Sequence, residues 1–428
     1  MTRPSPPSRA RRPTVPRTAR RSAAVAFGLQ GFLLAVVLTQ LPQYQERFGL
    51  SDTLIVVSVV TLSVVAGTGS VLAEALARRV GSAGTLRLGL ALIAITAVGV
   101  AASPGATAVL VVLAAYGLGL GIVDAAANMQ AVAIQHEYGR FILSSFHAVW
   151  SVGSIVGALF VAATNALDAP FVTIQMGAAL VVAAGLAWAA PRLLPRDPSR
   201  ATRRGTDSGT GAFPPEVRRA LIALGVALAL FYAVDFGIGN WSALFLTNVL
   251  HSDGGTAALG LAAYQCAALV ARGCGDRAVA RIGELAVVRA ATVVGVIGLL
   301  LVATAPSPAV AITGFLVTGL GLPVVAPLCF GIVGRLAPAG RLDSVIARVN
   351  IFNYVGTLCG AAIIGSVAAG AGLRIGFAVA VGFVAALTVL ASAFAAPRRS
   401  RTGPAADPTQ GISFVEGTDA GPDGGERR

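Results

Sequence analysis

Long apolar runs constrain the fold of this chain more than any other feature of its sequence. A helix needs about 20 predominantly apolar residues to cross a bilayer. Twelve runs reach that length, and they are residues 23–45, 53–75, 85–103, 106–134, 143–165, 170–190, 219–248, 256–275, 285–304, 309–334, 344–369 and 372–396. A helix satisfies its own backbone hydrogen bonds, as lipid requires. We therefore predict an all-α polytopic membrane protein with twelve transmembrane helices.

The amount and placement of charge support this prediction. Only 12% of the 428 residues are charged, against roughly 25% in soluble domains. A net charge of +13 would favour nucleic acid as a partner of a soluble protein. Here the arginines lie in short loops between apolar runs, so we predict a lipid bilayer and no nucleic acid. No catalytic set, zinc spacing or Walker motif is present, and we predict no enzyme, cofactor or metal site.

Arginine placement predicts the orientation of the helices. Thirty of the 32 basic residues fall on one side when the spans alternate, and only Arg47 and Arg374 fall on the other. Basic loops face the cytoplasm. We predict a plasma (inner) membrane protein with both termini inside. Its cytoplasmic segments are a disordered basic arm (1–22), a linker (191–218) and a disordered tail (397–428).

An internal repeat divides the spans into two sets of six. Landmarks recur at an offset of 202 or 203 residues: Arg79-Val80-Gly81 as Arg281-Ile282-Gly283, Gly117-Leu118-Gly119-Leu120 as Gly319-Leu320-Gly321-Leu322, and Gly153 and Gly157 as Gly356 and Gly360. Six spans are an even number, so the two sets have the same orientation and form parallel repeats. We predict two six-helix bundles, residues 23–190 and 219–396.

With this architecture, the sequence resembles the major facilitator superfamily over about residues 20–396. Within it, the sequence is most similar to the branch of the fucose–proton symporter. The motifs that carry the likeness are Leu41-Pro42-Gln43-Tyr44-Gln45, Gly117-x-Gly119-x4-Asp124-x3-Asn128, Ser144-Ser145-Phe146-His147-x2-Trp150-Ser151-x-Gly153, Asn240-Trp241-Ser242-Ala243-Leu244 and Arg272-x2-Gly275-Asp276-Arg277-x3-Arg281-x-Gly283. The resemblance implies the major facilitator fold, transport by alternating access and function as a monomer.

Two departures bear on coupling to protons. The symporter has an acid in its first span, where this chain has Leu38. The superfamily's acid after span two is Glu74 here, and Ala75 follows it instead of an arginine. Asp124 and Asp235 are therefore the two candidates to bind a proton within the membrane.

Each of these acids has two interpretations. An ionisable group inside a span is costly and should face a cavity or a partner. Asp124 is either a proton-binding carboxylate, as the resemblance suggests, or a structural hydrogen-bond hub with Asn128. Asp235 has Leu33 as its counterpart in the first repeat. It is either a contact for solute or ion, or a buried acid paired for stability.

Several polar and aromatic side chains within the spans are candidates to line a solute cavity. Amides, hydroxyls and rings suit a sugar-like or other polar metabolite. The same groups also bond between membrane helices or anchor them at the interface. The candidates are Gln30, Gln40, Tyr116, Asn128, Trp150, Asn240, Trp241, Tyr264, Gln265, Asn350, Asn353 and Tyr354.

Charged residues at the cytoplasmic ends of spans are candidates for a gate. They are Glu74, Arg79, Arg140, Asp276, Arg277 and Arg281. Part of this charge only reflects the excess of basic residues on the cytoplasmic side of membrane proteins. The resemblance adds a salt-bridge latch that holds the two halves together when the carrier faces outward, with Asp276–Arg277 as its better copy.

The leading functional hypothesis is a secondary active transporter of a small solute, either proton-coupled or a uniporter. A drug or metabolite efflux carrier of the same superfamily is an alternative. A membrane sensor that kept the fold without transporting is another. The sequence determines neither the substrate nor the direction of transport.

Overall fold

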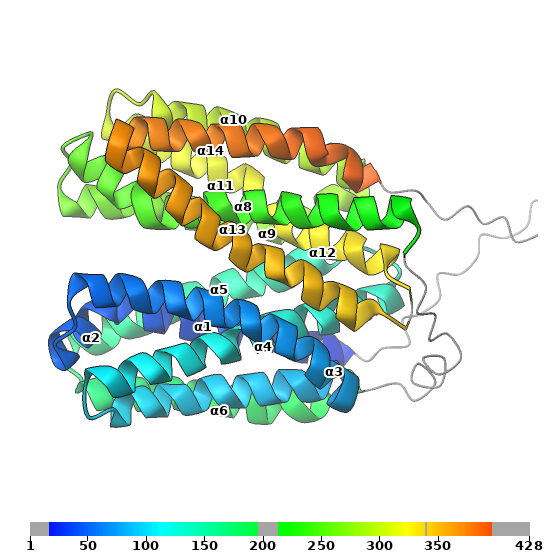
Figure 1. Ribbon diagram of the computed structural model, residues 1–428, viewed down its shortest axis with the longest axis horizontal. Helices are drawn as coiled ribbons and strands as arrows, with labels where there is room; N and C mark the ends of the chain where they lie inside the picture. The colour runs from blue at the N-terminus through cyan, green and yellow to red at the C-terminus, as the bar shows by residue number, and fades with distance from the viewer. Residues whose placement is uncertain (1–16, 196–212, 339, 396–428) are drawn as a thin grey trace, which may run out of the picture. The chain divides into compact units, whose positions relative to one another are not determined.

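A computed structural model describes residues 17–195, 213–338 and 340–395, which are almost entirely helical and contain no strand (Figure 1). Most of the predicted disordered arm, most of the predicted linker and all of the predicted disordered tail lie outside this described part. The elements are α1 (Arg17–Thr39), α2 (Leu41–Phe48), α3 (Asp52–Ala102), α4 (Ala106–Tyr138), α5 (Leu143–Ala166), α6 (Phe171–Ala189), η1 (Ala190–Arg192), α8 (Pro215–Asn248), α9 (Gly254–Ile282), α10 (Glu284–Ala303), α11 (Pro308–Gly321), η2 (Leu322–Val324), α12 (Val325–Leu336), α13 (Leu342–Ala371), α14 (Leu373–Leu390) and η3 (Ala391–Ala395).

These elements provide the twelve predicted spans. Within the described ranges, eleven helical stretches are long and apolar enough to cross a membrane. One of them, α3, is 51 residues long and contains two spans, because Gly81 leaves the helical conformation at φ 77° and ψ 165°. The segments α11, η2 and α12 together make a single span that is broken at Leu322–Val324. Pro323 lies in this break, as its missing N–H favours.

Helix boundaries differ from the sequence prediction at two places. The first span does not continue to residue 45: α1 ends at Thr39, and α2 begins at Leu41. Pro42 explains the break, since proline is accommodated in the first turn of a new helix and not in a helix interior. Helix α1 also begins at Arg17, so residues 17–22 are helical and not part of a disordered arm.

The internal repeat is visible in the backbone itself. Gly283, which is 202 residues after Gly81, has nearly the same conformation, with φ 80° and ψ 163°. A positive φ is accessible to glycine without steric cost, which accounts for the residue type at both positions. Helix caps repeat as well: Ser51 accepts a bond from the Leu54 N–H, and Asp253 accepts one from the Thr256 N–H.

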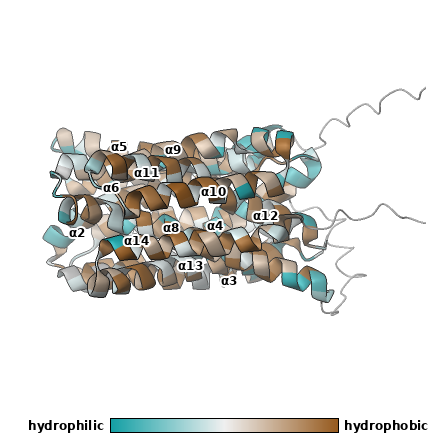
Figure 2. Cartoon of the chain, turned by 90° about the horizontal axis from the view of Figure 1, so that it is seen from above, coloured by the Kyte–Doolittle hydropathy of each residue, from teal (hydrophilic) through white to brown (hydrophobic). Residues whose placement is uncertain are grey.

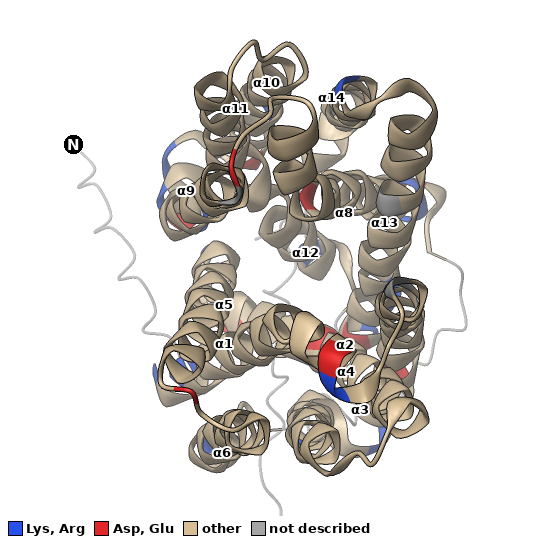
Figure 3. Cartoon of the chain, turned by 90° about the vertical axis from the view of Figure 1, so that its left-hand side faces the viewer, with Lys and Arg blue, Asp and Glu red and all other residues tan. Residues whose placement is uncertain are grey.

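The two sets of helices form two groups, α1 to α6 and α8 to α14, hereafter the N-terminal and C-terminal halves. Figure 3, which looks along the helices from the α2 end, shows the two groups with few charged positions among them. Apolar residues cover the sides of the helices, and hydrophilic ones gather at their ends (Figure 2). This pattern is the one that a bilayer requires. We call the end of the helix bundles that carries Arg79, Arg140 and Arg281 the arginine-rich end.

Small residues bring helices within each half into close contact. A Cβ on Gly153 would collide with the Gly28 backbone of α1. In the second repeat, a Cβ on Gly356 would collide with the Ala229 backbone of α8. Because lipid tails are as apolar as leucine, such close van der Waals packing is a main source of association between membrane helices.

Substitution of Gly356 tests this contact. Gly356→Ala should lower the thermal stability of the purified protein by an amount typical of overpacking, about 1–3 kcal/mol. Gly382→Ala in α14 is a matched control, because a Cβ there meets nothing within 4 Å. Thermal unfolding in detergent, followed by tryptophan fluorescence, measures both variants. Equal midpoints for the two would contradict the close approach of α8 and α13.

Candidate functional site

The polar contacts between the two halves gather around Asp124, in the middle of α4. Asp124 is about 14 residues from the end of that helix, or ~21 Å at 1.5 Å per residue. Its side chain is half-buried. At this depth a carboxylate needs partners from the protein, because lipid provides none.

Four side chains donate hydrogen bonds to the Asp124 carboxylate. From the N-terminal half, Gln30 Nε2 donates to Oδ1 at 3.3 Å. From α13 in the C-terminal half, Asn350 Nδ2 and Asn353 Nδ2 each donate to Oδ2 at 2.9 Å. The Tyr354 hydroxyl donates to the same oxygen at 3.3 Å. Asp124 is thus an acid of one half held mainly by donors of the other.

Two neighbours extend this network within the N-terminal half. Asn350 Nδ2 also donates to Ser70 Oγ at 2.9 Å, and the Ser70 hydroxyl donates to the Gly121 carbonyl at 3.3 Å. The Asn128 amide donates to the backbone carbonyl of Asp124 at 3.0 Å and not to its carboxylate. Asn128 therefore contributes to the helix rather than to the acid.

The second intramembrane acid, Asp235, has a different setting. Its carboxylate accepts a short hydrogen bond from the Tyr264 hydroxyl of α9, so both partners belong to the C-terminal half. Neither Asn240 nor Trp241 joins them: Asn240 is exposed, and the Trp241 ring lies against Gly365 of α13. The Asp235 side chain is half-buried.

Arg272 of α9 belongs to one of the motifs that carry the family likeness, but it was not among the predicted site residues. It lies inside the predicted span 256–275, and it is only 5% exposed. Its Nη1 donates to Ser151 Oγ at 2.7 Å, and its Nε donates to the Pro323 carbonyl at 3.4 Å. The Trp150 ring lies 5.6 Å from the guanidinium carbon. Its position within the apolar run 256–275 was the sequence feature from which its burial could have been predicted.

The remaining cavity candidates do not form one cluster in the structure. Gln40 and Tyr116 are fully buried, and neither the Gln40 amide nor the Tyr116 hydroxyl has a hydrogen-bond partner. Gln265 is half-buried. His147, to which the sequence motif also drew attention, is packed between the Phe27 and Phe330 rings at centroid distances of 5.2 and 6.4 Å.

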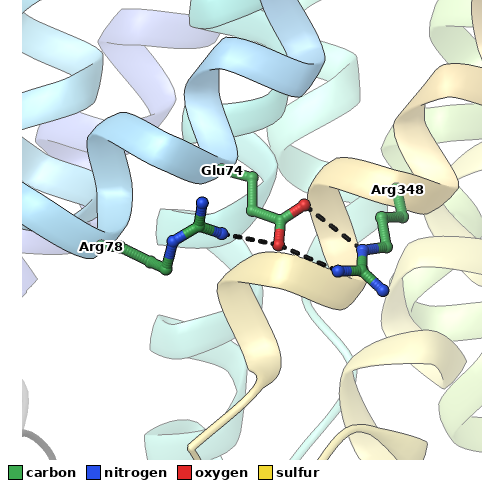
Figure 4. Close-up of polar contacts among 3 residues, drawn as sticks. All are labelled: Glu74, Arg78 and Arg348. Carbon is green, nitrogen blue, oxygen red and sulfur yellow. Dashed lines mark hydrogen bonds and ion pairs between the residues drawn. The ribbon is translucent and has the colours of Figure 1, made fainter.

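Nearer the arginine-rich end, Glu74 joins the two halves. The Arg78 guanidinium of the same helix lies 2.8 Å from Glu74 Oε1. Arg348 of α13 reaches the same carboxylate with Nε at 3.3 Å and Nη2 at 3.2 Å (Figure 4). Arg348 was not among the predicted gate residues, because it lies at the start of the predicted span 344–369 and no motif includes it.

Asp276, the repeat counterpart of Glu74, makes a second contact between the halves. Its two carboxylate oxygens accept hydrogen bonds from the Ser144 N–H at 2.9 Å and the Ser145 N–H at 3.2 Å, at the start of α5. A carboxylate there satisfies free amides and the positive end of the helix dipole. Asp276 of the expected latch thus joins the two halves, but through backbone amides and not through a salt bridge. Arg277, Arg281, Arg140 and Arg79 have exposed side chains at this end.

The chemistry available here is binding and proton exchange rather than catalysis. Within the described residues, no three His, Cys, Asp or Glu side chains come together as a metal site would need. The contacts are reversible hydrogen bonds and ion pairs between halves of one chain.

Known proteins share this architecture and sequence. An uncharacterised MFS-type transporter of Yersinia pestis is 29% identical over 390 residues, which cover 88% of this chain and 95% of that protein. The human organic anion transporter MFSD10 superposes with a TM-score of 0.72 at 17% identity, covering 88% of this chain and 99% of that one. The E. coli fucose:proton symporter FucP gives 0.70 at 17% identity, covering 89% and 99%.

The family assignment rests on the sequence as a whole. Residues 2–158 and 224–418 match the profile of the Major Facilitator Superfamily, which is more than half of the chain. The solved structures, at 17% identity, share the fold. The chain therefore belongs to the Major Facilitator Superfamily, whose members are secondary transporters of small solutes and not enzymes.

Proposed function

We propose that this secondary transporter couples the movement of its solute to a proton that Asp124 binds. The observation that carries the proposal is the junction at Asp124, where one carboxylate of the N-terminal half accepts bonds from three α13 side chains. An ionised carboxylate only accepts hydrogen bonds, whereas a protonated one has a donor of its own. Protonation therefore weakens this junction between the halves.

The contacts between the halves support an outward-facing state. The hydrogen bonds described above that cross between the halves involve Asp124, Arg272, Asp276 and Glu74, all from mid-depth to the arginine-rich end. By the positive-inside rule that end faces the cytoplasm. The access route to mid-depth is then from outside. In this proposal a proton and a solute bind from outside, and their binding breaks the contacts between the two halves. The cytoplasmic end then opens and both are released there, which is symport.

The proposal also includes the membrane, the orientation and the oligomeric state of this carrier. We place it in the plasma (inner) membrane with both termini in the cytoplasm, acting as a monomer in the lipid bilayer. Residues 23–190 and 219–396 are its two moving bundles, and 191–218 is the cytoplasmic linker between them. Asp235, joined to Tyr264, is the second candidate for proton or solute contact. Uniport and efflux are outcomes that the experiments below distinguish from symport.

Asp124→Asn tests the coupling. Proteoliposomes with an inward gradient of one pH unit should accumulate the solute up to about tenfold if one proton moves with it, since one pH unit corresponds to 1.36 kcal/mol. The variant has no proton to release, so it should equilibrate the solute without accumulating it, while still exchanging solute across the membrane.

Asp253→Asn is the control for this measurement. Asp253 is an exposed acid that caps α9 at the opposite end, and its variant should accumulate the solute like the wild type. Accumulation by Asp124→Asn as steep as in the wild type would assign the proton elsewhere. Exchange without accumulation in the wild type itself would indicate uniport.

The contacts at the arginine-rich end give a separate prediction. Asp276→Ala removes a helix cap that joins the halves, which is worth ~1 kcal/mol, and should shift the protein several-fold toward an inward-facing state. Glu74→Ala should shift it less, because the Arg348 side chain is 63% exposed and exposed ion pairs contribute little. Electron–electron distances between spin labels at positions 80 and 282, in a background without native cysteines, measure the shift.

The Glu284–Arg335 ion pair provides a matched control at the same end. Its atoms are 3.0 Å apart, and both residues belong to the C-terminal half. Glu284→Ala should leave the distribution of label distances unchanged. A shift as large as that of Asp276→Ala would mean that charge alone, and not contact between the halves, controls the equilibrium.

A further inference from the structure

Arg272 is a buried cation whose direct contacts among the described residues include no acid. Its side chain is 5% exposed, about ten residues from the end of α9, or ~15 Å into the bundle. Among the described residues, no carboxylate forms an ion pair with it within 4.0 Å. A charge at this depth is costly, and a buried charge without a partner costs several kcal/mol.

The contacts that Arg272 does make are with neutral groups, and they leave donors unused. The guanidinium has five N–H donors in a rigid fork. One bonds the Ser151 hydroxyl and one the Pro323 carbonyl, while the Trp150 ring lies beside the charge. No second arginine is among these neighbours, and the His147 imidazole lies within electrostatic range without contacting the guanidinium. A fork with free donors and no anion is the arrangement that binds a carboxylate bidentately.

The internal repeat shows which anion is missing. Ser70 is the counterpart of Arg272 at the 202-residue offset, and Ala326 is the counterpart of Asp124. In the N-terminal half, Ser70 and the Asp124 carboxylate share one partner, the Asn350 amide. In the C-terminal half the position that corresponds to Asp124 is Ala326, which has a methyl group and no carboxylate. One repeat thus has an acid held by neutral donors, and the other has a cation without an acid.

Asp235 does not take the place of that missing acid. It is within electrostatic range of the guanidinium, yet its carboxylate is held by the Tyr264 hydroxyl of the same half. The partners of Arg272, in contrast, include Ser151 and Trp150 of the opposite half. An anion bound at Arg272 would therefore lie between the halves, where a transported solute must bind.

From these observations we propose that the transported solute is a small carboxylate, and that the Arg272 guanidinium binds its carboxylate group between the two halves. This proposal rests on the carrier function proposed above and narrows its substrate class from polar metabolites to acidic ones. The absence of a second arginine favours a single carboxylate over a phosphate dianion.

The binding of this anion also affects the contact between the halves. The Arg272–Ser151 hydrogen bond, at 2.7 Å, joins α9 to α5. A carboxylate that binds the fork competes with Ser151 for the same donors. Solute binding therefore loosens the α5–α9 side of the junction, while protonation of Asp124 loosens the α4–α13 side. Release of both sides is what opens the arginine-rich end.

Matched acid and amide probes test the proposal on the purified full-length protein. The pairs are glucuronate with glucuronamide, propionate with propionamide, and succinate with succinamide, and the readout is the thermal unfolding midpoint in detergent. In the wild type, a carboxylate should raise the midpoint and its amide should not. This comparison needs no variant. An amide that stabilises the protein as well as its acid overturns the proposal.

Variants then assign the effect to Arg272. Arg272→Gln should abolish the shift produced by the carboxylate, and Arg272→Lys, which keeps the charge without the fork, should weaken binding about tenfold or more. Arg289→Gln in α10 removes an exposed arginine outside this site; it is the matched control and should retain carboxylate binding. A carboxylate shift that survives unchanged in both Arg272 variants would place the anion elsewhere.

Uptake measured on the same preparations separates this proposal from the carrier function. Wild-type proteoliposomes that take up a neutral member of a pair, with equal uptake by Arg272→Gln, would keep the transporter and overturn the acidic substrate. Carboxylate stabilisation that depends on Arg272, without uptake of that probe, would keep the binding site and contradict its place in transport.

Discussion

Water is absent from the hydrocarbon core, and this constraint determines where each polar group of the chain can lie. In residues 17–195, 213–338 and 340–395 the backbone meets it by remaining helical with few interruptions. Polar side chains meet it by pairing across helices, and the Asp124 carboxylate does so with donors that belong mostly to the other half. The hydrogen bonds that satisfy the buried Asp124 carboxylate thus also hold the two halves together. Opening the contact between the halves therefore requires these same hydrogen bonds to break.

The fold could be predicted because its determinants are local or periodic. Run lengths predict spans, arginine placement predicts their alternation, and the repeat predicts two equivalent halves. The backbone extends that repeat to Gly81 and Gly283, whose conformations agree within a few degrees. Boundaries were predicted less well where one residue outweighs hydropathy. Pro42 ends the first span early, and the polar start of α1 at Arg17 is helical although its composition resembles a disordered arm.

The candidate site was predicted in part, and the division has a physical reason. Acids and amides within spans are rare, so Asp124, Asn350 and Asn353 could be recognised individually from sequence. Their meeting depends on how α13 packs against α4, which no local pattern encodes. Arginines were harder to interpret, because most of them report topology alone. Arg272 and Arg348 have the same residue type as the loop arginines, and only the structure separates a buried guanidinium from an exposed one.

The two halves share a backbone repeat but differ in charge at its centre, and transport needs this difference. If the two halves had identical side chains at the centre, both would offer the same binding groups. The protein would then have no separate sites for the proton and the solute. Here the α4–α13 side has an acid with neutral donors, and the α5–α9 side has a cation with neutral acceptors. Under the two proposals above, each side responds to a ligand of one sign, the acid to a proton and the cation to an anion. Neither ligand alone removes both sets of contacts, so a structure closed at the arginine-rich end opens fully only when both are bound, and this requirement is coupling.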